Sequence, residues 1–194
     1  MPGEMPVDRW KLDLDVFQSF YSSRPKEEKW ELIDGSPVMM PPPSLVHQRI
    51  AKNLETALDA FFIAHGIRWR ADREIGVLLP KDKKYNPEPD VTVIDQDVKL
   101  GQIFADKFYL VAEVLSPNDK AWVLKSKLAY FQAHENCLAV LFLRQDRIGA
   151  DLYLRTAGWK KLTITSHAGR IDIPGIGDIG ALGALYRDTP LFTS

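Results

Sequence analysis

Residues 89–94 (PDVTVI) and residues 108–115 (FYLVAEVL) decide the fold of this chain. Their β-branched and aromatic content predicts two buried strands. Each run carries one carboxylate, because Asp90 opens the first and Glu113 lies near the end of the second. A carboxylate in a buried strand costs free energy unless its charge is compensated. If the two strands are neighbours, the acids meet at one place, where their repulsion calls for a cation.

Helices are predicted on both sides of these strands. Ser44 is suited to cap a helix over about residues 45–65, which Gly66 would close. A second long helix is expected over about residues 119–134, after a stop at Ser116-Pro117. A short helix is predicted from Asp15, as its cap, to about Tyr21.

The remaining apolar runs predict further strands around the central pair. Asp34-Gly35 supplies the positive φ of a tight turn between strands at residues 30–33 and 38–40. Shorter strands are expected at residues 69–71, 74–79, 138–143, 148–154 and 160–165. The pattern indicates an α/β fold with a mixed sheet flanked by helices. The chain length of 194 residues suits one domain over residues 12–194, preceded by a loosely ordered segment 1–11.

Composition narrows the class of protein. Hydrophobic residues make up 45% and charged residues 26%, and the formal net charge of −1 gives no overall basic field for nucleic acid. No apolar run approaches the roughly 20 residues of a membrane span, and the start MPGEMPVDRW lacks the apolar region of a secretory signal. A cytoplasmic protein without membrane contact is therefore expected. The single cysteine, Cys137, excludes a disulfide framework and a multi-cysteine zinc site, and it is interpreted as a core residue.

Lys127 is the cation best placed to meet the two acids. It lies three residues after Leu124 and four before Phe131, at the edge of an apolar stripe that also includes Leu128. A lysine leaning onto the core can neutralise a carboxylate or a phosphate oxygen. Two other readings stay open: the stem covers apolar surface while the ammonium reaches water, or Lys127 forms a purely structural ion pair with Glu113.

Three further polar residues are weaker candidates. Glu31, between Trp30 and Leu32, faces inward or outward depending on strand register. His47 lies on the inward side of its helix and is a base, a phosphate ligand or a histidine with a structural hydrogen bond. Glu74 begins a strand and could join a metal shell.

The sequence resembles the Uma-type restriction endonuclease family of the PD-(D/E)XK nuclease superfamily over about residues 12–155. The residues that carry the resemblance are Trp30-Glu31-Leu32-Ile33-Asp34-Gly35, Met40-Pro41-Pro42-Pro43-Ser44, His47-Gln48, Pro89-Asp90-Val91 and Glu113-Val114-Leu115-Ser116-Pro117.

The resemblance implies a restriction-endonuclease-like core and a divalent-metal site held by Asp90 and Glu113. The superfamily usually places a lysine two residues after the second acid, but that position here is Leu115. The family supplies the lysine from the following helix, where Lys127 matches. Glu31 and His47 match family positions around the same cleft. An acid common in the family four residues before that lysine is here Val123.

Residues and resemblance together predict metal-dependent phosphodiester hydrolysis in nucleic acid, with DNA as the expected substrate. Asp90 and Glu113 would hold Mg²⁺ or Mn²⁺, with Glu31 completing the shell. Lys127 would orient the attacking water or stabilise the transition state, and His47 would hold a phosphate. A catalytically inactive module of the same fold, used for binding or assembly, is the main alternative. A two-carboxylate glycosidase is disfavoured, because an aromatic sugar platform is lacking. A homodimer is a family-level expectation only.

Overall fold

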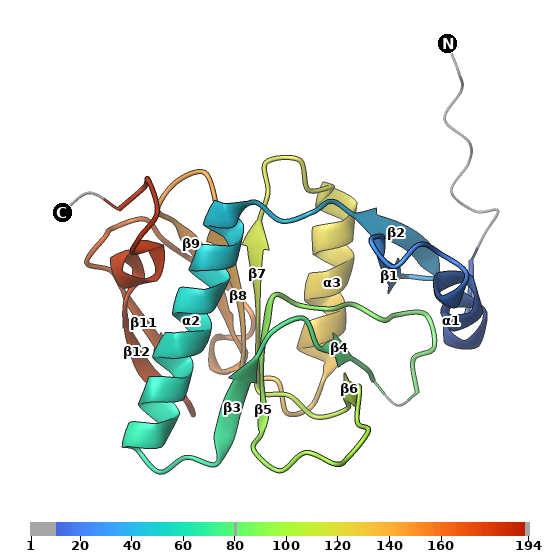
Figure 1. Ribbon diagram of the computed structural model, residues 1–194. Helices are drawn as coiled ribbons and strands as arrows, with labels where there is room; N and C mark the ends of the chain where they lie inside the picture. Colours follow the sequence, from blue (N-terminus) through green and yellow to red (C-terminus); the bar gives the residue numbers. More distant parts are fainter. Residues whose placement is uncertain (1–10, 80, 193–194) are drawn as a thin grey trace.

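A mixed six-stranded sheet forms the centre of the computed structural model, which describes residues 11–79 and 81–192 (Figure 1). The strand order is β10-β9-β8-β7-β5-β3. Only β7 and β8 pair in parallel, and the other four pairs are antiparallel. The strands are β3 (Trp69–Asp72), β5 (Val91–Asp95), β7 (Leu110–Leu115), β8 (Ala139–Arg144), β9 (Ala150–Leu154) and β10 (Lys161–Ile164). The predicted α/β fold with a mixed sheet is confirmed.

The two long helices, α2 (Leu45–Ala64) and α3 (Ala121–Ala133), cover opposite faces of this sheet (Figure 1). Successive side chains of the central strand β7 point to opposite faces of the sheet, and each face has its own hydrophobic core. Leu110, Ala112 and Val114 join the core under α2, whereas Val111 and Leu115 join the core under α3. Glu113 follows this alternation and therefore points to the α3 side.

Smaller elements complete both faces. The short parallel pair β4 (Gly76–Val77) and β6 (Phe104–Ala105) adds Val77 and Ala105 to the α3 side. The chain end packs beside α2 as β11 (Arg170–Ile173), β12 (Gly177–Ala181) and a 3₁₀ helix over Leu182–Tyr186. A second 3₁₀ turn spans Arg155–Ala157. Within the described ranges, no helix is long and apolar enough to cross a bilayer.

A hairpin of β1 (Lys29–Ile33) and β2 (Ser36–Met40) lies beyond α3, with helix α1 (Leu14–Ser22) against it (Figure 1). Asp34 and Gly35 have φ of 48° and 74°, as the predicted tight turn requires at both central positions. From β2 the chain passes across the carboxyl end of β7 to α2 (Figure 1). This connection, residues 41–44, is called the proline strap below.

Several predicted boundaries were wrong for local reasons. Asp13, and not Asp15, caps α1, since its side chain accepts a hydrogen bond from the Val16 amide. Helix α3 begins after Asp119, whose carboxylate instead accepts from the Ser116 amide at 2.7 Å. The strand expected to reach residue 79 stops at Val77, because the Leu79 amide donates to the Tyr130 hydroxyl. Residues 1–10 of the expected loose segment lie outside the described ranges, whereas Lys11 pairs with Asp34 at 2.9 Å.

Cys137 is fully buried, and burial raises the pKa of its thiol to about 12. Because the thiolate is the reactive form, we expect no labelling of the native protein by a disulfide reagent at neutral pH. Denaturant should release one reactive thiol per chain, measured by the absorbance of the leaving group. Fast labelling without denaturant would contradict this placement of Cys137.

Candidate active site

Strand register brings the two predicted acids together. Strands β5 and β7 are antiparallel neighbours with Val91 opposite Ala112, so the preceding residue, Asp90, lies opposite Glu113. The Val114 amide donates a hydrogen bond to Asp90 Oδ2 at 2.7 Å, which fixes the Asp90 carboxylate against β7. The neighbouring pair of buried strands, predicted from sequence, therefore places both carboxylates at one end of the sheet.

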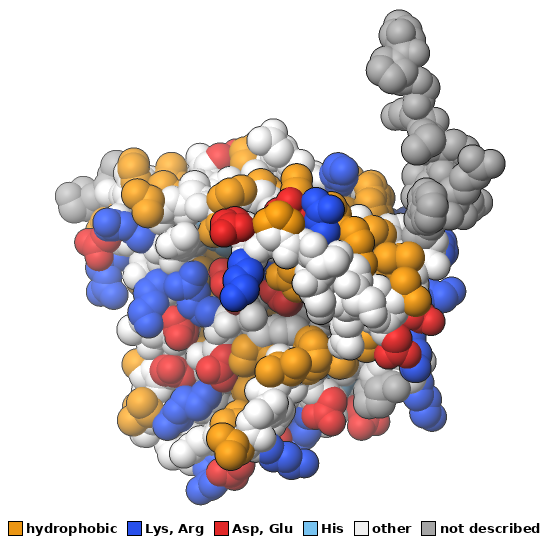
Figure 2. Space-filling model, turned by 45° about the vertical axis from the view of Figure 1, so that its right-hand side comes forward, with side chains coloured by type: hydrophobic (Ala, Val, Ile, Leu, Met, Phe, Trp, Pro, Cys, Tyr) orange, Lys and Arg blue, Asp and Glu red, His pale blue; other side chains and the backbone are white. Residues whose placement is uncertain are grey.

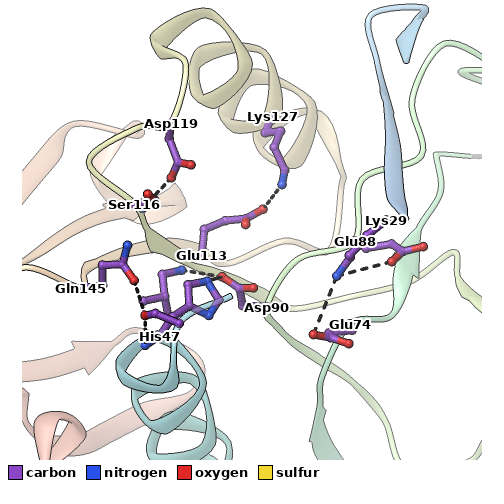
Figure 3. A network of polar contacts seen from close by, with 12 residues as sticks. Lys29, His47, Glu74, Glu88, Asp90, Glu113, Ser116, Asp119, Lys127 and Gln145 are labelled. Carbon is purple, nitrogen blue, oxygen red and sulfur yellow. Dashed lines mark hydrogen bonds and ion pairs between the residues drawn. The ribbon is translucent and has the colours of Figure 1, made fainter. Parts of the chain in front are cut away.

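Lys127 reaches this place from α3 and is almost completely buried, with 1% of its surface exposed. Its Nζ lies 2.6 Å from Glu113 Oε1 and 3.0 Å from Glu31 Oε2 (Figure 3). The buried residues of α3 are Val123, Lys127, Tyr130 and Phe131. Lys127 thus sits in the middle of the buried face and not at its edge, because two carboxylates meet its charge there. The interpretation that its ammonium reaches water is wrong.

Glu31 faces inward from β1 and is 1% exposed. Its Oε1 accepts hydrogen bonds from the Glu88 amide at 3.0 Å and from Lys127 Nζ at 3.2 Å. The hairpin is thereby tied to α3 and to the segment before Asp90, while Glu31 Oε2 lies 3.0 Å from Lys127 Nζ and has no hydrogen-bond partner among the described residues. This contact settles the register that the sequence left open.

His47 stands in the first turn of α2, with its Nε2 3.1 Å from Asp90 Oδ2 (Figure 3). Ser44 caps the helix as predicted by accepting from the His47 amide at 3.1 Å. The side chains of His47 and Asp90 are each about 15% exposed. Two nitrogen-bearing side chains thus divide the acids: Lys127 contacts Glu31 and Glu113, and His47 contacts Asp90.

The electrostatics of the cluster follow from burial and crowding. Burial raises the pKa of Glu113 to about 8; the Asp90 and Glu31 charges add to this, and Lys127 opposes it. Burial lowers the pKa of Lys127, but Glu113 and Glu31 outweigh it and hold that pKa above its ordinary value. Burial also opposes ionisation of Asp90, yet His47 and the Val114 amide keep its pKa low. Of the strand pair, Glu113 therefore takes a proton more readily than Asp90.

All five predicted site residues line one cavity of about 320 Å³. They are Glu31, His47, Asp90, Glu113 and Lys127. Of the described residues that line it, six are Asp or Glu and three are Lys. The proline strap and the end of β2 line the same cavity. The cavity is therefore an acidic pocket with an excess of carboxylate oxygen atoms.

Comparison with known proteins identifies the family and supports the fold. A family model, Uma2, described as "Putative restriction endonuclease", matches residues 14–175. The chain belongs to the Uma2 family. A search of curated proteins finds no match to this chain. Among solved structures, one described as a "putative nuclease belonging to DUF820" from Anabaena variabilis ATCC 29413 is 16% identical, with a TM-score of 0.73. The match covers 90% of this chain and 97% of that one and supports the fold.

Sequence reasoning missed several residues that this Uma2 chain places in the cavity. Glu88 and Lys29 form an ion pair at 3.6 Å, and Lys29 also lies 3.9 Å from Glu74, the weaker metal candidate (Figure 3). Gln145 accepts a hydrogen bond from Ser44 Oγ at 2.8 Å. A signal for Gln145 existed: it follows β8, and the carboxyl ends of the parallel strands β7 and β8 meet at one edge.

Proposed function

We propose that this chain is a metal-dependent nuclease that hydrolyses phosphodiester bonds of DNA, with Asp90, Glu113 and Lys127 as its central residues. The observation that carries the proposal is the buried acid pair, gathered with Lys127 in a pocket that has twice as many carboxylates as lysines. Such a pocket repels phosphate unless a cation compensates it. Membership of a family described as restriction endonucleases supports the same reaction class.

The donor set fits a magnesium ion. Among residues 11–79 and 81–192, no group of three or more His, Cys, Asp or Glu side chains is placed to hold a metal together. Mg²⁺ is nevertheless usually bound through only one or two carboxylates, with waters and substrate phosphates filling its other positions. Asp90 and Glu113 would supply those two carboxylates. Glu31, predicted as a third ligand, accepts through Oε1 from the Glu88 amide and from Lys127, so we assign it mainly to holding Lys127.

Each side chain then has a role in hydrolysis. The bound ion would supply Lewis-acid activation of water and neutralise charge on the phosphate. Lys127, held by Glu31, would stabilise the charge that develops on the phosphate oxygens. His47, held by Asp90, would donate to a phosphate oxygen beside the site. Water adds to phosphorus and one P–O bond breaks, which leaves a phosphomonoester and a hydroxyl group.

A binding module without activity is the second candidate, because the acid common in the family before the helix lysine is here Val123. The structure weakens this objection. Val123 is 5% exposed and lines the cavity, but Lys127 already contacts two carboxylates without it. The substitution therefore leaves Lys127 with charged partners, and activity remains the better proposal.

The direct test is cleavage of supercoiled plasmid and of labelled single-stranded DNA by the purified protein, with Mg²⁺ or Mn²⁺ and with excess chelator. We expect cutting that requires the metal and stops when the chelator is added. Metal-independent cutting would contradict the mechanism. Metal binding without cutting of either DNA would favour the binding module.

The raised pKa of Glu113 predicts a pH-dependent response to metal. The folded protein holds this proton more tightly than the unfolded chain does, so this group's contribution to stability falls as pH rises from about 4.5 towards about 8. A metal ion binds the ionised form of Glu113, so at pH values below about 8 it must displace the proton. We therefore expect the rise in melting temperature caused by Mg²⁺ to grow as pH increases to about 8 and then to level off. An equal rise at acidic and alkaline pH would contradict the assignment of Glu113.

A further inference from the structure

The cavity has two unlike walls. One wall carries the carboxylates and Lys127. The other is formed by residues 38–43, every one of which lines the cavity, and it is called the apolar wall here. It consists of Val38, Met39, Met40, Pro41, Pro42 and Pro43. Because proline has a fixed φ and no N–H group, the three prolines give this wall a stiff surface with few donors.

The apolar wall suits an aromatic base. Methionine is flexible and polarisable and makes favourable contacts with aromatic rings, and Met40 lies on the hairpin face that also carries Lys29 and Glu31 and lines the cavity. A nucleotide has a charged phosphate at one end and a flat aromatic base at the other. The wall of acids with its metal ion matches the phosphate, and the apolar wall matches the base.

The size and depth of the cavity limit what can enter. Its volume of about 320 Å³ is at the lower end of small-molecule pockets, which suits one nucleotide and not a base pair. The reacting groups also lie deep, since Glu113 is 7% exposed and Lys127 is 1% exposed. In a duplex the bases are stacked and paired, and a base must leave the stack before a pocket can take it.

The charge of the molecule also favours contact with a short piece of nucleic acid. Proteins that hold duplex DNA neutralise many phosphates with Lys and Arg. This chain has a formal net charge of −1, and the side drawn in Figure 2 shows basic side chains scattered among acidic and hydrophobic ones, with no continuous basic surface. The side drawn in Figure 2 therefore offers little support for a long stretch of nucleic-acid backbone, which suits contact with one nucleotide in the cavity.

We propose that the cavity binds one nucleotide of single-stranded DNA, with its base against the apolar wall, and that single strands are the preferred substrate. This inference rests on the proposed nuclease function.

The test compares one labelled strand free, in a full duplex, and in a duplex with an unpaired bubble, each with Mn²⁺. We expect the free strand and the bubble to be cut at least about tenfold faster than the full duplex. Cutting of the full duplex at an equal or greater rate would overturn the inference and leave the nuclease proposal standing. No cutting of any strand would contradict the nuclease proposal, and the inference would fall with it.

A variant of the apolar wall separates base binding from catalysis. Met40→Ala should lower kcat/KM on single-stranded DNA by about tenfold, mainly through KM, and should lower it much less on a strand that is abasic at the cleavage site. Leu100→Ala is the matched control, because Leu100 is a fully exposed apolar residue outside the cavity. The Mn²⁺-induced rise in melting temperature should be the same in both variants. Equal kcat/KM for Met40→Ala and wild type would overturn the role of this wall.

Discussion

Replacing Asp90 by asparagine is expected to lower metal-dependent DNA cleavage by at least about a thousandfold. The change removes the negative charge but keeps an oxygen that can accept the hydrogen bond from the Val114 amide, so the fold should persist. Rates of plasmid and single-strand cutting at matched purity measure the effect. Circular dichroism and the melting temperature report whether the variant is folded.

Asp95→Asn provides the control for this variant. Asp95 ends the same strand, β5, and pairs with Lys107 at the opposite end from the cavity. Its replacement should leave the cleavage rate near that of the wild type. If Asp90→Asn cuts DNA as fast as Asp95→Asn does, Asp90 is not part of the reacting site.

Replacing Lys127 by methionine is expected to lower the free energy of unfolding by about 3–5 kcal/mol, the typical cost of breaking a buried ion pair from one side. Methionine fills much of the same volume, but Glu31 and Glu113 would stay buried without their cation. Urea unfolding of the variant and the wild type at neutral pH measures the loss. Cleavage should be lost in the same variant.

Two further variants show whether charge or packing causes this loss. Lys125 lies on the exposed side of the same helix. Lys125→Met should therefore change the free energy of unfolding by no more than about 0.5 kcal/mol. Adding Glu31→Gln to Lys127→Met removes a buried carboxylate that has lost its cation and should restore part of the stability. Equal stability of Lys127→Met and Lys125→Met would show that the buried cluster does not carry these charges.

The sheet and the acid pair could be predicted because their signals are local. Residues 91–94 and 110–115 are apolar runs with β-branched residues, and such runs favour buried strands. Asp90 directly precedes the first run and Glu113 lies within the second, so pairing of the two strands was enough to bring the two acids together. The Asp34-Gly35 turn and the Ser44 cap were likewise confirmed, because their chemistry acts within a few residues.

The partners of these acids depend on tertiary contacts that sequence periodicity does not contain. The apolar residues of α3 placed Lys127 at the edge of a stripe, yet the helix turns it inward to reach Glu31 on a distant hairpin. Glu31 could not be assigned a face, because β1 and β2 form a two-stranded sheet apart from the central one, and the inward side of β1 is set by α3. The apolar wall also went unnoticed, since Pro41-Pro42-Pro43 was considered only as part of the family resemblance.

The central claim is that the Asp90–Glu113 pair holds a divalent ion, and calorimetric titration of Mn²⁺ into the wild type and into Glu113→Gln tests it most directly. Glutamine keeps the shape of the side chain and can still contact Lys127, so both proteins should be folded. We predict a saturable isotherm for the wild type, and affinity weaker by about a hundredfold or more for the variant, since even partners outside the metal shell contribute about 10–100-fold. Equal affinity in the two proteins, or no binding by the wild type, would contradict the account.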